Sequence, residues 1–244
     1  MSNVPEAPPI YRPVMLPEAA DAGTEASAAA AAGADPATLF WVDRGDRAQC
    51  AVVLSPEQPL HQAAQMTVVG MTALGDALGA ILPPMVVVGC RLPGAMLLND
   101  AKLGVVQVIA PAQCAADVVP NWLVVAIDIG VTRFAEGSDK AADLSVTTFE
   151  DESCMGITVG ATTGAFARYL LTWIDRWQTD GFDPVRTSWT TRGDPVGQEI
   201  ELQLPGRACS GRFTGLSDAG DVLIEGENDK SRIAAADLLV RWEG

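Results

Sequence analysis

Only a few side chains in this sequence have the types and spacing that catalysis usually needs. His61 is the only histidine, so a zinc site with several histidine ligands or a Ser-His-Asp triad would rest on one residue. The cysteines are odd in number and form no CxxC pair, as expected for reduced core residues: Cys50, Cys90, Cys114, Cys154 and Cys209. The acidic run at 150–152 lacks the spacing of metal ligands and indicates a solvated loop. These patterns predict no metal site and disfavour histidine-based catalysis.

Composition and charge exclude several classes of partner. Hydrophobic residues make up 48% of the 244 positions and charged residues 19%, which is typical of a globular protein with a core. The 16 Lys and Arg against 31 Asp and Glu give a net charge of −15, which repels nucleic acids and anionic lipid surfaces. No uninterrupted apolar run approaches the ~18 residues of a membrane span, and the N-terminus lacks the regions of a signal peptide. We therefore expect a cytosolic protein that binds neither nucleic acid nor membrane.

The first part of the chain predicts an extension, a helix and a pair of strands. Residues 1–20 are rich in proline and should run along the surface. Residues 25–34 are mostly alanine and are followed by an Asp-Pro pair, which favours a helix over the alternative of a disordered spacer. Two apolar runs, at 39–42 and 51–54, lie too close in sequence to hold a long loop between them. Residues 43–49 are therefore predicted to form a tight antiparallel hairpin.

The middle of the chain predicts a buried helix and then a region rich in strands. Residues 59–79 repeat apolar residues at helical spacing and carry almost no charge. Four later runs are β-branched and bounded by turn residues, which indicates strands at 85–88, 95–98, 103–109 and 122–131. Residues 164–178 place aromatic and aliphatic side chains on one helical face, a pattern typical of core packing. Because regular βαβ alternation is missing, we expect a mixed, largely antiparallel sheet.

The C-terminal part changes character after Asp194-Pro195. Short strands separated by glycine turns are indicated at 198–204, 211–216, 221–225 and 231–233. A module this small would have a thin core by itself, so we expect it to dock on the larger domain. The predicted organisation is an α+β (α/β) protein with an N-terminal extension over 1–20, an α/β domain over 21–194 and a small barrel over 195–244.

One stretch of the chain is similar to a motif of a known family. Residues 91–108, RLPGAMLLNDAKLGVVQV, resemble the segment KWPNDI-x-x-N-x-x-K-x-x-G-I-L-x-E of biotin protein ligases, in the biotin/lipoate A/B protein ligase family. The match has no gap and places Arg91 on the first lysine and Pro93 on the proline. Asn99 falls on the later asparagine, and Lys102 on the lysine that in the family contacts the acyl-adenylate.

The flanking segments occur in the family's order. NWLVVAIDIGV at 121–131 resembles the family strand written vvIGIGINV, and residues 181–202 resemble its Gf-x-x-y-x-x-W…G-x-x-V-x-v segment. Residues 211–226 resemble G-x-a-x-G-I-d-x-x-G-x-L-l-v of the small C-terminal domain. The resemblance implies the ligase catalytic fold with a mixed, mostly antiparallel sheet and a C-terminal SH3-like β-barrel.

Two departures affect the chemistry that the resemblance implies. The family has a GRGRRGR loop that orders over the adenylate, whereas this chain has the short DRGDRAQ with only Arg44 and Arg47. Binding a triphosphate and shielding a mixed anhydride from water are tasks suited to guanidinium groups and a closing loop. In addition, Leu92, Gly94 and Ala95 replace the tryptophan, asparagine and aspartate of KWPND, which removes an amide and a carboxylate. Much of the ligase equipment is therefore missing.

The resemblance nevertheless nominates site residues, each with an alternative. Lys102 is the candidate catalytic residue, a cation that would hold the phosphate and carboxyl oxygens of an acyl-adenylate as charge develops. The alternative is an ordinary exposed lysine after a turn. The candidate ligand-binding residues are Arg91, Asn99, Gly104, Arg44 and Arg47. The arginines could equally be solvated surface charges, and Gly104 lies one position before the family glycine.

Three hypotheses about function follow. The chain is a diverged ligase or acyltransferase that acts on a small carboxylic or acyl ligand and a carrier-protein lysine. Alternatively, it is a catalytically silent relative that binds such a ligand or a carrier, or a subunit of a complex. Biotin, lipoate and ATP are implied by the resemblance alone, and a homodimer is possible because the family includes dimers joined through the central sheet. We expect ATP-dependent biotinylation to be very weak or undetectable.

Overall fold

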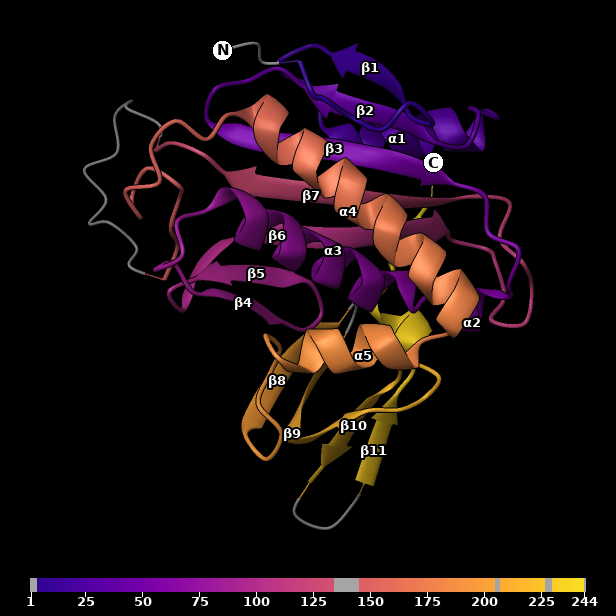
Figure 1. Cartoon of the computed structure of the whole chain (residues 1–244). Coiled ribbons are helices and arrows are strands. Elements are labelled where there is room, and N and C mark those ends of the chain that lie inside the picture. Colours follow the sequence, from indigo (N-terminus) through magenta and orange to yellow (C-terminus); the bar gives the residue numbers. More distant parts are fainter. Residues whose placement is uncertain (1–3, 134–144, 205–206, 227–229, 244) are drawn as a thin grey trace.

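The protein has two layers of helix around one large sheet, with a second, smaller sheet beside it (Figure 1). The computed structural model describes residues 4–133, 145–204, 207–226 and 230–243. Helices α3 (Met66–Ile81) and α4 (Val159–Asp180) cover one face of the large sheet, and α1 (Ala22–Ala31) packs on the other. The short helices are α2 (Leu60–Ala63) and α5 (Asp183–Thr190).

The large sheet is mixed and mostly antiparallel, which confirms the expected fold class. Its order is β1-β2-β3-β7-β6-β5-β4, and β12 pairs with β6. The β1–β2 and β6–β12 pairs are parallel and the other neighbouring pairs are antiparallel. The strands are β1 (Arg12–Leu16), β2 (Thr38–Val42), β3 (Arg47–Leu54), β4 (Val88–Arg91), β5 (Ala95–Leu98), β6 (Ala101–Pro111), β7 (Leu123–Gly130) and β12 (Val240–Trp242).

Both faces of the central strands are apolar because helices cover both. Alternate residues of β7 point to opposite faces, so Val125 and Ile127 join the core under α3 and α4 while Val124 packs with α1. The helical stretch Leu60–Ile81 is long and apolar enough to cross a membrane by length and composition. Since 78% of its most apolar 18-residue window is buried inside the protein, its hydrophobicity is explained by its contacts with the sheet and α4.

The connection between β2 and β3 is the tight hairpin that the sequence predicts. Only residues 43–46 separate the two strands, which pair in antiparallel register. Within this turn the Arg44 guanidinium donates two hydrogen bonds to Asp46, at 2.7 and 2.9 Å. Arg44 is therefore held beside the sheet by a contact within the turn, and no long excursion separates these strands.

Several predicted elements were misplaced or missed. The strand expected at 85–88 was wrong: β4 begins at Val88, and Met85 is 85% exposed. Part of the N-terminal extension forms β1, an edge strand. Pro13 is tolerated there because one side of an edge strand has no neighbouring strand to which its backbone amides must donate. Helix α5 was not anticipated. The helix expected over 59–79 is broken into α2 and α3 at residues 64–65.

The C-terminal region folds as a small antiparallel sheet, consistent with an SH3-like domain. Its order is β11-β10-β9-β8, with β8 (Glu199–Leu204), β9 (Arg207–Leu216), β10 (Val222–Glu225) and β11 (Lys230–Ile233). The last strand departs from the expected barrel. After a short 3-10 helix, η1 (Ala235–Leu238), the chain returns to the large sheet as β12. It pairs with the end of β6, which β5 is too short to reach.

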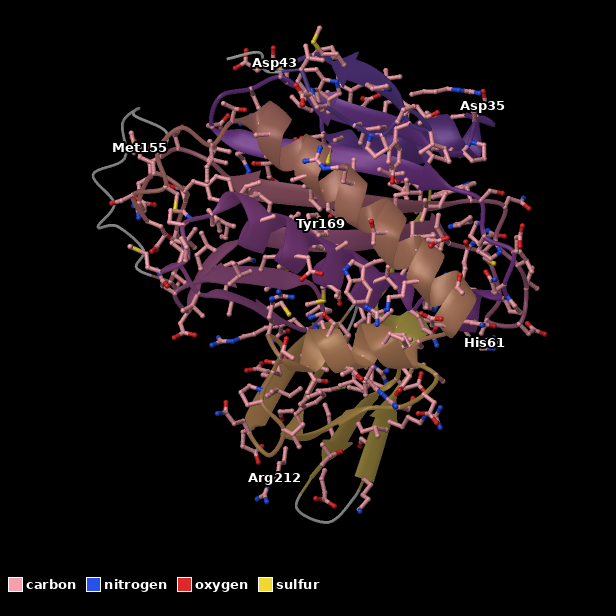
Figure 2. All side chains as sticks on the ribbon, viewed as in Figure 1. Asp35, Asp43, His61, Met155, Tyr169 and Arg212 are labelled. Carbon is pink, nitrogen blue, oxygen red and sulfur yellow. The ribbon has the colours of Figure 1, made fainter. Side chains whose placement is uncertain are left out.

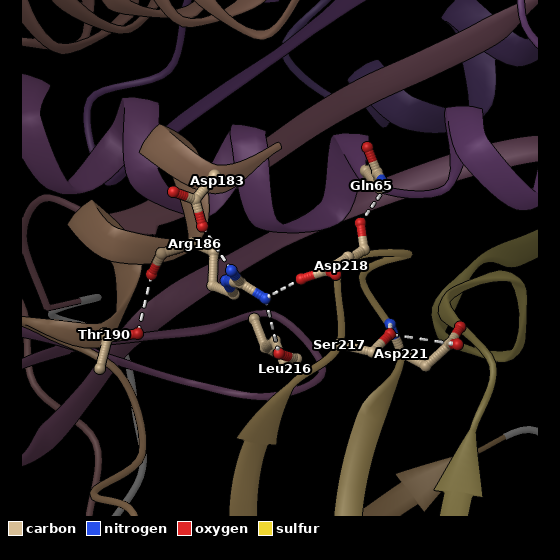
Figure 3. Close-up of polar contacts among 8 residues, drawn as sticks. All are labelled: Gln65, Asp183, Arg186, Thr190, Leu216, Ser217, Asp218 and Asp221. Carbon is tan, nitrogen blue, oxygen red and sulfur yellow. Dashed lines mark hydrogen bonds and ion pairs between the residues drawn. The ribbon is translucent and has the colours of Figure 1, made fainter. Parts of the chain in front are cut away.

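Polar contacts fasten the small sheet to the large domain (Figure 3). Arg186 of α5 donates to Asp218, at 2.5 Å, and to the Leu216 carbonyl of β9. Gln65, between α2 and α3, donates to the Asp218 carbonyl at 3.3 Å and accepts a hydrogen bond from the Trp177 indole at 2.6 Å. These contacts agree with the expectation that the C-terminal module is docked.

Candidate functional site

Lys102 lies at the start of β6, immediately after a two-residue turn. Asn99 and Asp100 have φ values of 47° and 69°, the left-handed conformation that a tight hairpin between β5 and β6 requires. The Lys102 amide donates to Ser145 O at 2.8 Å, and its carbonyl accepts from Thr147 N at 2.9 Å. The side chain is exposed, and no carboxylate of the described segments forms an ion pair with its ammonium. The backbone of Lys102 is thus fixed while its charge stays available.

The Lys102 side chain borders a cavity of about 380 Å³. Its walls come from the β2–β3 turn, the start of β6, the end of β7 and residues 145–148. The lining residues are Asp46, Arg47, Lys102, Leu103, Gly104, Gly130, Thr132, Arg133, Val146, Thr147 and Thr148. We call this space the Lys102 cavity. It contains three cations and one carboxylate, although the chain as a whole is strongly acidic.

The single carboxylate of the Lys102 cavity is already neutralised. Burial would raise the pKa of Asp46, but the hydrogen bonds and charge of Arg44 outweigh burial and hold the pKa below its ordinary value. Asp46 therefore stays ionised and paired with Arg44 from its own turn. Arg47 and Arg133 are also paired, with Asp128 and Asp151, so the positive charge that no described carboxylate balances is that of Lys102, which favours an anionic ligand.

Arg47 is oriented by an acidic partner behind it. Its Nε donates to Asp128 Oδ1 at 2.5 Å across the β3–β7 pair, and no described residue engages its two terminal nitrogens. A guanidinium fixed through Nε can still present its terminal fork to carboxylate or phosphate oxygens. Arg133 is held in a comparable way, since its Nε donates to Asp151 Oδ1 at 2.6 Å. Sequence reasoning missed Arg133, because nothing local marks it as facing the same space as Lys102.

Gly104 lines the Lys102 cavity, but strand packing explains its missing side chain. A Cβ there would lie 2.0 Å from the Asp128 carbonyl oxygen and 2.9 Å from Ile129 Cα. Gly94 is constrained similarly, because a Cβ would stand 2.1 Å from the Val106 carbonyl oxygen. Gly104 within β6 and Gly94 in the β4–β5 turn both permit close approach of backbone to backbone, a recurrent use of glycine in and beside sheets.

Asn99 is near Lys102 in sequence and does not line the Lys102 cavity. Its Oδ1 accepts from the Val87 amide at 3.0 Å, and its Nδ2 donates to Glu152 Oε2 at 2.6 Å. These contacts occupy both ends of the amide, so direct ligand contact by this side chain would require breaking them. These contacts indicate that the Asn99 side chain stabilises the backbone around it.

Arg91 borders a different cavity, of about 590 Å³, between β4 and the start of β8. That cleft also contains Asp194, which is buried and accepts a hydrogen bond from the Leu92 amide at 2.9 Å. Burial raises the pKa of Asp194, and the Leu92 amide and the Arg91 charge only partly oppose this effect. The structure therefore brings together Lys102, Gly104 and Arg47, with Arg44 beside them, and places Arg91 elsewhere.

His61 lies far from this site. Figure 2 shows His61 near the C-terminal end of α4 and Met155, which follows the cavity wall in sequence, at the opposite end of the molecule. The His61 ring Nδ1 is 2.8 Å from the Ala116 carbonyl oxygen. Within the described segments, no group of three or more His, Cys, Asp or Glu side chains could hold a metal ion.

A comparison with known protein families identifies the class of this protein. A family model described as the biotin/lipoate A/B protein ligase family matches residues 7–191, so the chain belongs to this family. The mixed, mostly antiparallel sheet and the small C-terminal sheet agree with the fold that the resemblance implies.

Individual relatives agree on the fold. The chain is 28% identical to a biotin–[acetyl-CoA-carboxylase] ligase of Paracoccus denitrificans over 208 residues, covering 81% of this chain and 82% of that protein. A biotin protein ligase-like protein of unknown function from Silicibacter sp. TM1040 is 27% identical with a TM-score of 0.86, covering 96% and 99% of the two chains. The biotin protein ligase of Aquifex aeolicus in complex with biotin and ATP is 16% identical with a TM-score of 0.70, covering 93% and 97%. The last similarity shows the fold alone.

Proposed function

We propose that this protein is a ligand-binding member of its family that holds the carboxyl or phosphate oxygens of a small acyl compound in the Lys102 cavity. The observation that carries the proposal is the Lys102 ammonium, which has no carboxylate partner among the described residues and shares the cavity with Arg47 and Arg133 in a chain of net charge −15. Hydrogen bonds from charged donors to oxyanions are shorter and about twice as strong as neutral ones. A cytosolic location belongs to the same proposal.

The proposal assigns little or no ATP-dependent ligation to the chain. The β2–β3 connection is a short turn, so it supplies no loop to close over a reactive mixed anhydride. Gly94 and Ala95 bring no polar side chain where the family motif has an amide and a carboxylate. Removing one preorganised donor to a developing oxyanion typically lowers a rate by about 10² to 10³. Groups that act together subtract less than their sum, yet several are absent here at once.

A second function is favoured by one specific observation. The chain is similar over most of its length to a protein named as a ligase acting on acetyl-CoA carboxylase, and Lys102 keeps the position of the motif lysine. On this alternative the carboxylate attacks the α-phosphate of ATP with release of pyrophosphate, and a carrier-protein lysine then attacks the acyl carbon of the acyl-adenylate with release of AMP and a proton. Lys102 would then stabilise negative charge on the acyl oxygen as the lysine attacks.

Ligand binding should be tested with Lys102→Met and a matched lysine variant. Lys230 pairs with Glu225 on the far side of the small sheet and is 85% exposed, so Lys230→Met removes the same charge away from the cavity. Biotin, lipoate, octanoate, ATP and a biotinyl-adenylate analogue would be added to each protein and their affinities measured by calorimetry and thermal shift. A ligand at 100 times its dissociation constant adds about 2.7 kcal/mol of stability. We expect an anionic acyl compound to bind wild type and Lys230→Met, and to bind Lys102→Met at least tenfold more weakly.

The two functions differ in a transfer assay. Purified protein, ATP, biotin or lipoate and an apo-carrier protein would be incubated and the carrier examined by mass spectrometry. Robust modification that Lys102→Met abolishes would establish the transferase alternative. Equal affinity of wild type and Lys102→Met for every probe would contradict the binding proposal.

A further inference from the structure

One wall of the Lys102 cavity does not belong to the regular sheet. Residues 145–148 run beside Lys102 and form a single parallel bridge, between Lys102 and Val146. Two backbone hydrogen bonds hold the wall there, from the Lys102 amide to Ser145 O and from the Thr147 amide to Lys102 O. Beyond this bridge, Phe149 anchors the segment by burying its ring in the core, 1% exposed. Two more backbone hydrogen bonds follow, from the Phe149 amide to Gly130 O and from the Glu150 amide to Val131 O, and since each contributes only about 0.5–1.5 kcal/mol, side-chain contacts add appreciably to the position of the wall.

Side-chain hydrogen bonds connect the wall to the turn before Lys102. Asn99 joins the β5–β6 turn to Glu152 through the 2.6 Å bond from its Nδ2 to Glu152 Oε2. The other oxygen of Glu152 accepts a hydrogen bond from Thr147 Oγ1 at 2.7 Å. Thr147 is the wall residue whose amide donates to Lys102. The turn that precedes Lys102 and the wall that faces it are therefore connected through Asn99 and Glu152.

The polarity of these bonds requires an amide at position 99. Asn99 accepts from the Val87 amide through Oδ1 and donates to a carboxylate through Nδ2. A carboxylate of the same shape could accept from Val87 but could not donate to Glu152. It would also place two negative charges at hydrogen-bond distance, beside the further carboxylates Asp100 and Asp151.

We infer that Asn99 and Glu152 are positioning residues of the Lys102 cavity, which hold residues 145–148 against Lys102 and thereby set the affinity of the cavity for an oxyanion. Neither side chain lines the cavity, so both act through Thr147 and the backbone of Lys102. This inference rests on the proposed function for its ligand, while the connection itself is a property of the free protein.

The test exchanges the donor and acceptor groups of the hydrogen bond between Asn99 and Glu152. Asn99→Asp should break the bond to Glu152, whereas the double variant Asn99→Asp with Glu152→Gln should restore it, because glutamine can donate to the new carboxylate and still accept from Thr147. Asn121→Asp adds the same charge at an exposed residue before β7 and serves as the control. Hydrogen exchange of the Lys102 and Thr147 amides, followed by mass spectrometry, reports the wall without any ligand. Calorimetry with inorganic pyrophosphate reports the affinity of the cavity.

We expect Asn99→Asp to speed exchange of both amides at least tenfold and to weaken pyrophosphate about tenfold, with both values returning towards wild type in the double variant. Unchanged exchange in Asn99→Asp, or exchange that the double variant does not restore, would overturn the inference. If exchange follows the expected pattern but wild type does not bind pyrophosphate, the connection stands and the assignment of an oxyanion ligand fails.

Discussion

Replacing Gly104 by alanine tests whether this glycine serves strand packing or ligand contact. The added Cβ would lie 2.0 Å from the Asp128 carbonyl oxygen, where carbon and oxygen normally approach to about 3.3 Å. Relief requires β6 and β7 to move apart by about 1 Å, against a usual spacing of about 4.8 Å between strands. Gly104 and its partner Ile129 are buried, while the neighbouring pair Val105–Asp128 is partly exposed beside the Lys102 cavity.

The magnitude follows from two costs. Overpacking a well-filled interior costs about 1–3 kcal/mol, and each buried backbone group left without a partner costs about 1–3 kcal/mol. We therefore expect Gly104→Ala to lower the free energy of unfolding by about 2–6 kcal/mol, a large part of the 5–15 kcal/mol typical of folded domains. For a chain of this size that loss corresponds to a fall in Tm of about 10 °C.

Urea denaturation followed by circular dichroism measures this loss, and Gly79→Ala provides the control. Gly79 lies in α3, and a Cβ added there would meet no neighbouring atom within 4 Å, so alanine should stabilise the helix by about 0.5–1 kcal/mol. A Gly104→Ala protein with wild-type stability and weakened ligand binding would refute the packing explanation and indicate direct ligand contact instead.

Two further predictions concern buried titratable groups. Brief iodoacetamide treatment and peptide mapping should find Cys114 and Cys209 modified in the native protein. Cys50 and Cys90 should stay unmodified, because burial raises the pKa of each thiol to about 12. Rapid modification of either buried thiol would contradict the packing. Asp194→Asn should raise the free energy of unfolding in urea at pH 7 and leave it unchanged near pH 3. Burial raises the pKa of this carboxyl above 3.8, so it destabilises the fold only when it is ionised. A variant that is less stable at pH 7 would show that the carboxylate is needed.

Local patterns were sufficient for most elements of the large domain. The apolar spacing over 59–79 predicted a buried helix, and α3 is buried along most of its length. The closeness of the runs at 39–42 and 51–54 predicted the tight β2–β3 turn, because so short a connection leaves few alternatives. The strand at 95–98 was also placed correctly, since turn residues mark both of its ends.

Some errors arose where contacts distant in sequence decide the outcome. The apolar residues at 85–88 have the composition of a strand, yet the edge of the sheet runs from Val88 to Arg91, where the Cys90 amide donates to the Arg192 carbonyl. The C-terminal residues were predicted as part of the small barrel, but β12 pairs with the end of β6 in the large sheet. β4 pairs with the nearby β5, but its contact with Arg192, like the pairing of β12 with β6, joins residues about 100 or more positions apart, which no local pattern reveals.

The same distinction between local pattern and distant contact applies to the candidate site. By itself the sequence determined the family, the two-residue turn at Asn99 and Asp100, and the candidacy of Lys102, because these depend on residue types in fixed order. Only the tertiary structure showed that Arg133 joins Lys102 at one cavity, that Arg91 borders another, and that Asn99 binds Glu152. A motif specifies order along the chain, whereas a binding site depends on which side chains the sheet and its flanking segments bring together in space.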